Sequence, residues 1–182
     1  MKNLKDIINE KLVINKNIKI NKYHYHPTEW SELKELVKKL IKERGIEANL
    51  NDIDVSKITN LSNLFSSGDE NDFNGDISEW DVSNVEEMEE MFENCKFNGD
   101  ISNWDVSNVK NMFGMFAYSD FNGNISKWDV SNVTDMQEMF NGSKFTGKNG
   151  DISDWDVSKV TNMTDMFDNC PLEKNPPKWY KK

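Results

Sequence analysis

The sequence predicts an α/β solenoid of about five 24-residue repeats, each made of one strand and one helix, with an N-terminal α-helical cap. Three observations lead to this prediction: a motif that recurs at a fixed period, two alternating periodicities inside it, and an amphipathic segment ahead of the array. Residues 1–48 are assigned to the N-terminal segment and capping helix. Residues 49–182 are assigned to the repeat array and a C-terminal cap.

The recurring motif opens at Phe73 with Phe-Asn-Gly-Asp-Ile-Ser-Glu-Trp-Asp-Val-Ser-Asn-Val and returns at Phe97, Phe121 and, with a changed opening, Phe145. Its period is 24 residues, until the insertion Lys148-Asn149-Gly150 lengthens the last step to 27; the tryptophans that mark the steps are Trp80, Trp104, Trp128 and Trp155. A degenerate copy covers residues 53–65. A half-copy with Leu172 and Trp179 follows Cys170, and atypical ends of this kind are expected of capping repeats.

Two periodicities alternate inside the motif. The second half predicts a short helix, because its apolar residues recur at helical spacing, as in Val85, Met88, Met91 and Phe92. Ser83 lies just before them as a candidate N-cap, with Asp81 as a competitor. Residues 75–78 have no helical period and predict a short extended segment.

The apolar columns of the aligned repeats predict the interior. Every Met except Met1 falls in one of two columns, and every Phe except Phe113 falls in a repeat column. A Met-rich stripe can also bind metals or peptides, but recurrence at the same place in each turn favours core packing. A Trp in each turn likewise favours burial over the stacking of sugar rings.

Residues 28–44 predict an amphipathic helix, with Pro27 ahead and Gly45 behind as start and stop signals. Such a helix would cover the open first turn of the array. Its lysines leave a membrane-surface helix as the alternative, which its acidic residues disfavour. Ahead of it, residues 12–14 and 18–20 predict a short hairpin or two extended runs.

The charge of the chain is uneven. The net charge is −10, but residues 1–48 carry +4 and residues 49–182 carry −14. An acidic array repels nucleic acid and anionic membranes, so direct binding to either is not expected. No apolar run resembles a signal peptide or a membrane span, which favours a cytoplasmic location; a surface location would require a trimmed leader.

The polar columns suggest turn chemistry more than metal binding. One aspartate ladder would repel itself unless backbone N–H groups bind each carboxylate, so we expect turn and cap roles; its members are Asp54, Asp81, Asp105, Asp129 and Asp156. A second ladder of Asp76, Asp100 and Asp151 is broken by Asn124. Calcium between turns is the alternative reading of both ladders.

The remaining reactive residues suggest neither a metal centre nor a disulfide. Cys95 and Cys170 lie three turns apart in one column, about 15 Å at the roughly 5 Å spacing of strands, so we expect free thiols. His24 and His26 have no further ligand nearby in sequence. No catalytic or phosphate-binding motif is found, so the chain is predicted to be no enzyme and to need no cofactor.

Residues 50–170 closely resemble the BspA-type leucine-rich repeat family of bacterial surface proteins, through the units Trp-Asp-Val-Ser-Asn-Val, Met-Phe and Phe-Asn-Gly-Asp-Ile-Ser. The resemblance implies a leucine-rich-repeat-like fold, no catalytic residues and, for members at the cell surface, adhesion to host or bacterial proteins. This chain differs in having no secretion signal and no lipoprotein cysteine near its start.

Variable helix positions point to a partner-binding surface. One repeat carries an acidic patch of Glu86, Glu87, Glu89, Glu90 and Glu93, and the next places Phe113 and Tyr118 where its neighbours have polar residues. The sequence therefore predicts a non-enzymatic module that binds a protein, favouring a basic one. An acidic, phage-type mimic of nucleic acid and a cell-surface adhesin remain as alternatives, and the oligomeric state is open.

Overall fold

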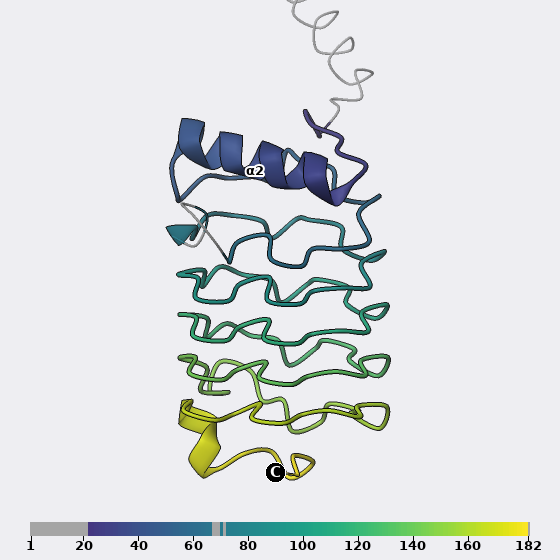
Figure 1. Cartoon of the computed structure of the whole chain (residues 1–182), viewed down its shortest axis with the longest axis vertical. Helices are drawn as coiled ribbons and strands as arrows, with labels where there is room; N and C mark the ends of the chain where they lie inside the picture. Colours follow the sequence, from purple (N-terminus) through teal and green to yellow (C-terminus); the bar gives the residue numbers. More distant parts are fainter. Residues whose placement is uncertain (1–21, 67–69, 71, 182) are drawn as a thin grey trace, which may run out of the picture.

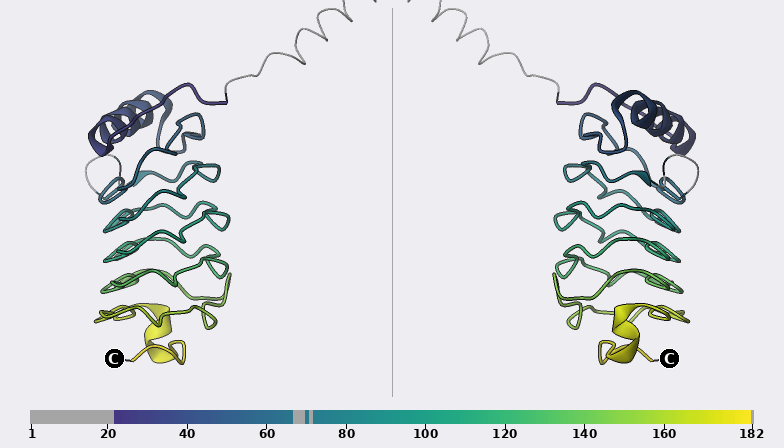
Figure 2. Two further views of the ribbon diagram at one scale, coloured as in Figure 1. Left: turned by 90° about the vertical axis from the view of Figure 1, so that its right-hand side faces the viewer. Right: turned by 90° about the vertical axis from the view of Figure 1, so that its left-hand side faces the viewer.

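The computed structural model describes residues 22–66, 70 and 72–181. Over that part the chain winds into a stack of similar turns, with helix α2 lying across the N-terminal end and the C-terminus at the opposite end (Figure 1). The side views show each turn as a thin layer below the previous one (Figure 2). The hairpin or extended runs predicted within residues 12–20 lie outside the described residues.

The predicted α/β solenoid of strand-plus-helix repeats is wrong. The α-helix of the described residues is α2 (Trp30–Arg44), and a short 3-10 helix, η2 (Pro171–Lys174), follows the last turn. Between them, neighbouring turns are joined by isolated parallel bridges, one row of which links Asn60, Glu87, Asn111, Asp135 and Asn162. The observed architecture is therefore a stack of coils that contain β-turns in place of the strand and the helix.

Each coil is a succession of β-turns that begin and end on buried residues. In the first full repeat, backbone amides donate to carbonyls three residues earlier, from Trp80 to Ile77, Val85 to Val82, and Met91 to Met88. The residues between these pairs are half-buried or exposed and mostly polar. Consecutive β-turns thus place apolar residues three apart, which a short helix also does, and this shared spacing produced the wrong prediction.

Two residues with positive φ interrupt each coil where the helix was predicted. In the first full repeat they are Glu90 (φ 51°) and Asn94 (φ 52°), and equivalent positions in the following coils are Gly114 and Tyr118, Glu138 and Gly142, and Asp165 and Asn169. A right-handed helix requires negative φ throughout. The amides of this segment donate instead to carbonyls of the next coil, over distances of 2.8 to 3.0 Å. The donors are Met88, Glu90, Phe92 and Asn94.

Two rows of stacked phenylalanine rings run through the interior. In one row the ring centroids are 5.4, 5.6, 5.7 and 5.8 Å apart, along Phe65, Phe92, Phe116, Phe140 and Phe167. The second row has spacings of 6.1, 6.4 and 6.3 Å, along Phe73, Phe97, Phe121 and Phe145. All of these rings are buried, so the predicted role of the Phe columns as core is confirmed.

The tryptophan column ties each coil to the preceding one. Each indole Nε1 donates to a backbone carbonyl of that coil at 2.9 to 3.3 Å, from Trp80 to Leu50, Trp104 to Ile77, Trp128 to Ile101 and Trp155 to Ile125. The rings of Trp80 and Trp104 stack with centroids 6.5 Å apart. These four rings are buried with their polar atom satisfied, which confirms the packing role expected of them.

Helix α2 covers the first coil, as predicted. It buries Leu33, Val37, Leu40 and Ile41 and ends at Gly45, whose φ is 92°. At its start, the amide and hydroxyl of Thr28 both donate to the Glu32 carboxylate, at 2.9 and 3.2 Å. Trp30, the first residue of the helix, is exposed, and its indole donates to the Ser62 carbonyl at 2.9 Å.

The C-terminal end is covered by η2 and the half-copy of the repeat. The Trp179 indole donates to the Ile152 carbonyl at 2.9 Å and stacks on Trp155, and the Tyr180 ring meets Phe167 edge-on at 5.0 Å. The predicted half-copy is therefore confirmed at Trp179. Beside it, one apolar row remains half-exposed although its equivalents in the inner coils are buried; it consists of Val157, Val160 and Met163.

Candidate protein-binding face

The residues predicted to bind a partner lie in two adjacent coils. The bridge between Glu87 and Asn111 sets residues 86–93 beside residues 110–117, and the bridge between Asn111 and Asp135 sets these beside residues 134–141. The predicted residues therefore belong to neighbouring positions in the stack, although they come from separate repeats.

The acidic residues differ in their surroundings. Glu86 is exposed and pairs with Lys110, with 2.6 Å between Oε2 and Nζ. Such surface pairs contribute only about 0 to 1 kcal/mol to stability. The Glu89 carboxylate accepts a hydrogen bond from Asn111 Nδ2 at 3.3 Å, and Glu87 is half-buried in the bridge row. Glu86 and Glu89 therefore already have polar partners within the array.

Glu90 and Glu93 lie near a third carboxylate, Glu138, which the sequence prediction missed. Glu90 and Glu138 hold the same position two coils apart, with Gly114 between them; a Cβ on Gly114 would lie 3.2 Å from Glu90 Cγ. Burial and then repulsion from Glu90 and Glu138 raise the pKa of Glu93. Within the described part of the chain, no salt bridge joins a cation to any of these three carboxylates.

Phe113 and Tyr118 belong to the coil between those of Glu90 and Glu138. Tyr118 is 56% exposed, the largest exposure among the large apolar residues that the structure describes. Its ring occupies the space above Gly142 in the next coil, where a Cβ would lie 2.5 Å from Tyr118 Cδ1. Phe113 is half-buried and shares its column with Glu89 and Gln137. The exposed tyrosine ring therefore packs where the glycine of the adjacent coil has no side chain.

The aspartate columns serve the turns. Asp76 Oδ1 accepts hydrogen bonds from the amide and hydroxyl of Ser78, at 3.0 and 2.7 Å, and Asp81 does the same with Ser83 at 3.2 and 2.6 Å. The serine amide bond lowers the pKa of Asp76. The expected turn role of these carboxylates is confirmed. The predicted helix N-cap role of Ser83 is wrong, because no helix follows it.

The other candidate sites involve few residues each. His24 and His26 lie 3.3 and 3.2 Å from the carboxylates of Asp52 and Asp54. Among the described residues, no three His, Cys, Asp or Glu side chains are placed to hold a metal ion. Cys95 and Cys170 are free thiols, as predicted, and both are buried. Burial raises the pKa of the Cys95 thiol to about 11, which keeps it protonated near neutral pH.

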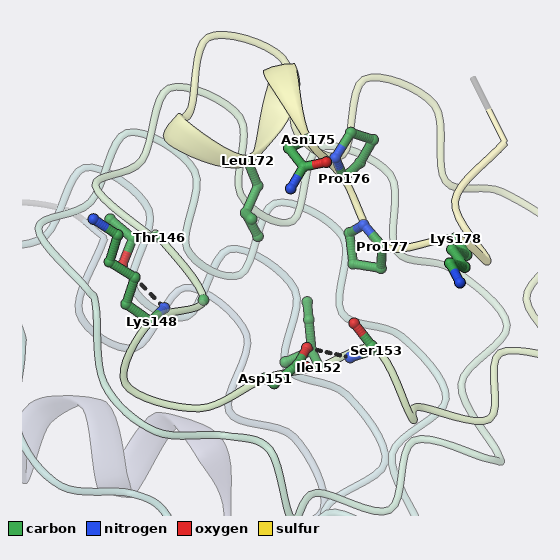
Figure 3. A pocket seen from close by; sticks show the side chains of 11 residues that line it. Thr146, Lys148, Asp151, Ile152, Ser153, Leu172, Asn175, Pro176, Pro177 and Lys178 are labelled. Atoms are coloured by element: carbon green, nitrogen blue, oxygen red, sulfur yellow. Dashed lines mark hydrogen bonds between the residues drawn. The ribbon is translucent and has the colours of Figure 1, made fainter.

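A pocket of about 350 Å³ lies between the insertion in the last full repeat and the C-terminal cap (Figure 3). Two of its polar groups take part in hydrogen bonds within its walls: Thr146 Oγ1 accepts from the Lys148 amide at 3.2 Å, and the Asp151 carboxylate accepts from the Ser153 amide at 2.9 Å. These acceptors shape the loops around the pocket.

Comparison with known proteins assigns the chain to a family. The model of a family described as "Mycoplasma protein of unknown function, DUF285" matches residues 31–148 and 117–181. No curated protein and no solved structure matches the sequence. Over the described residues, no helix has the length and apolar character needed to cross a membrane.

The identification of the repeats as BspA-type leucine-rich repeats is therefore corrected. The matching family is described only as one of unknown function, and the coils lack the strand-plus-helix unit that the resemblance implied. The match extends over most of the array and the capping helix. The chain thus belongs to the DUF285 family.

Proposed function

We propose that this protein is a non-enzymatic interaction module that binds a basic partner protein. The binding surface is the acidic-aromatic face, defined by Glu90, Glu93, Glu138, Phe113 and Tyr118. The observation that carries the proposal is the exposed ring of Tyr118 in the coil between those of Glu93 and Glu138, whose carboxylates have no cationic partner among the described residues. Exposed aromatic side chains are frequent anchors of protein interfaces. A partner's Lys or Arg would also relieve the repulsion that raises the pKa of Glu93.

The experiment compares immobilised variants in affinity capture from cells that produce the protein, with quantitative mass spectrometry. The test variant combines Phe113→Ala and Tyr118→Ala, which remove the aromatic anchors. Ile46→Ala is the matched control, because Ile46 is also an exposed apolar side chain but belongs to the N-terminal end. We expect proteins that the wild type and the control both capture to be lost from the test variant.

A second pair of variants measures the charge contribution. Glu93→Gln should weaken binding to the captured partner, whereas Glu79→Gln, which changes an exposed glutamate paired with Lys22, should not. A mimic of nucleic acid would bind through charge alone, with strong salt dependence and no effect of the aromatic variant. Equal capture by the wild type and the Phe113→Ala, Tyr118→Ala variant would refute the proposed face.

A further inference from the structure

The last full coil ends the stack with unpaired backbone groups. In the preceding coil, the amides of Met136, Glu138 and Phe140 donate to carbonyls of the last coil at 2.8, 2.9 and 2.9 Å. The equivalent amides of the last coil have no acceptor among the described residues; they belong to Met163, Asp165 and Phe167. Nor does any described amide donate to the Thr161 carbonyl, although Thr134, its equivalent, accepts one at 2.8 Å.

An apolar row accompanies this open edge. Val157, Val160 and Met163 are half-exposed, while the equivalent Val82, Val85 and Met88 of the first full repeat are buried. Together with Trp179 and Lys181 they line a shallow hollow. The half-copy covers the other half of the coil, where Trp179 and Tyr180 lie on Trp155 and Phe167.

The inner coils show which kind of segment covers this edge elsewhere in the stack. At each inner coil, the equivalent edge is covered by a segment of the next coil that supplies backbone carbonyls and two apolar side chains three residues apart, as Val133 and Met136 do. Here η2 and the tail project beyond the last coil (Figure 1). A second stack that approached this end would meet η2 and the tail before the last coil, so we consider a single added segment as the occupant.

We propose that the half-covered C-terminal end binds a segment of a partner protein, folded as residues 133–140 are, as an added half-coil. The segment runs parallel to residues 161–167, accepts hydrogen bonds from the amides of Met163 and Asp165, and packs two apolar side chains on Val160 and Met163. Pairing of an extended peptide with an exposed backbone edge is a general mode of recognition. This surface uses different groups from the acidic-aromatic face, so either proposal can fail without the other.

The test uses the full chain and a fluorescent peptide with the sequence of residues 132–140, Asn-Val-Thr-Asp-Met-Gln-Glu-Met-Phe. Fluorescence anisotropy measures binding, and hydrogen exchange by NMR locates it. We expect the peptide to bind and to slow exchange of the Met163 and Asp165 amides by about tenfold or more, because pairing protects an amide from solvent. A control peptide with Asp at the places of Val133 and Met136 should not bind.

A matched pair of variants confirms the location. Met163→Asp puts a charge into the apolar row and should weaken peptide binding at least about tenfold, whereas Thr164→Asp, at the neighbouring exposed position, should leave it unchanged. The proposal is overturned if the peptide does not slow exchange at Met163 and Asp165, or if both variants bind it equally. Protection of these amides that rises with protein concentration alone would also overturn it, because the occupant would then be a second copy.

Discussion

Along the segment equivalent to residues 88–94, the first coil presents backbone carbonyls at the N-terminal end of the stack, whereas the last coil presents backbone amides at the C-terminal end. Side-chain donors of α2 satisfy the carbonyls: Trp30 Nε1 donates to Ser62, and Lys34 Nζ donates to Asn63 and Leu64, at 2.8 to 2.9 Å. The direction of the backbone hydrogen bonds along this segment therefore decides that the N-terminal cap must supply donors to it.

The C-terminal end requires acceptors instead, and only part of that requirement is met by the described residues. The Asn169 amide donates to the Glu173 carboxylate at 3.1 Å, while those of Met163 and Asp165 have no described acceptor. Along this segment of the coil, where the amides donate to the next coil, the two ends of the stack thus need chemically opposite caps. The two ends also differ in apolar burial, since α2 buries four apolar residues and η2 buries none.

Core substitutions at the two caps should show the largest difference. Leu40→Ala removes a fully buried side chain of α2 and should cost about 2 to 5 kcal/mol of unfolding free energy. Leu172→Ala at the other end should cost less than about 2 kcal/mol, because Leu172 is only half-buried. Urea unfolding monitored by tryptophan fluorescence measures both. Equal costs would show that the ends contribute equally to stability.

The donor role of Lys34 gives a smaller effect. Lys34→Met keeps the apolar stem but leaves the carbonyls of Asn63 and Leu64 without this donor, which should cost about 1 to 3 kcal/mol. Lys38→Met is the control, since Lys38 is exposed on the same helix, and it should change stability by less than about 0.5 kcal/mol. The same urea titrations apply. A cost of Lys34→Met no larger than that of the control would contradict the donor requirement.

The sequence predicted the side-chain arrangement better than the backbone. The period, the buried Phe and Trp columns and the helix at 28–44 follow from residue identities that repeat or alternate, and the structure confirms them. The coil backbone was predicted wrongly, because apolar residues three apart fit both β-turns and a helix. The glycines and the asparagine at positive φ, Gly114, Gly142 and Asn94, were the available signal against a helix.

The acidic part of the candidate site contains a residue from a coil two steps away, which the sequence prediction missed. Glu138 joins Glu90 and Glu93 only because Gly114, in the coil between, has no side chain to separate them. The glycine was the available signal. Where a coil has Gly at a position, the residues at that position in the coils before and after it can approach each other, and this rule would have identified Glu138. The unpaired amides of Met163 and Asp165 have no such signal, because backbone pairing leaves the side-chain sequence unchanged.

The response to acid gives the smallest expected difference between the ends. Asp52, near α2, accepts two hydrogen bonds from Arg44, at 2.9 Å each, and these lower its pKa below the usual 3.8. A carboxyl with a lowered folded-state pKa stabilises the fold above pH 3.8 and loses that contribution as pH falls through the folded value. For a partly exposed pair we expect about 0.2 to 1 kcal/mol.

Asp52→Asn should therefore lower stability at pH 7 by that small amount and converge with the wild type as pH falls below 3.8 and through the lowered pKa of Asp52, in urea titrations across this range. Glu173→Gln at the other end retains an acceptor for the Asn169 amide, so its curve should follow the wild type within about 0.5 kcal/mol at pH 7. A constant gap between Asp52→Asn and the wild type from pH 7 to pH 3 would show that the Asp52–Arg44 pair acts through packing alone. The chemical difference between the caps would then rest on backbone hydrogen bonds and apolar burial, without a contribution from charge.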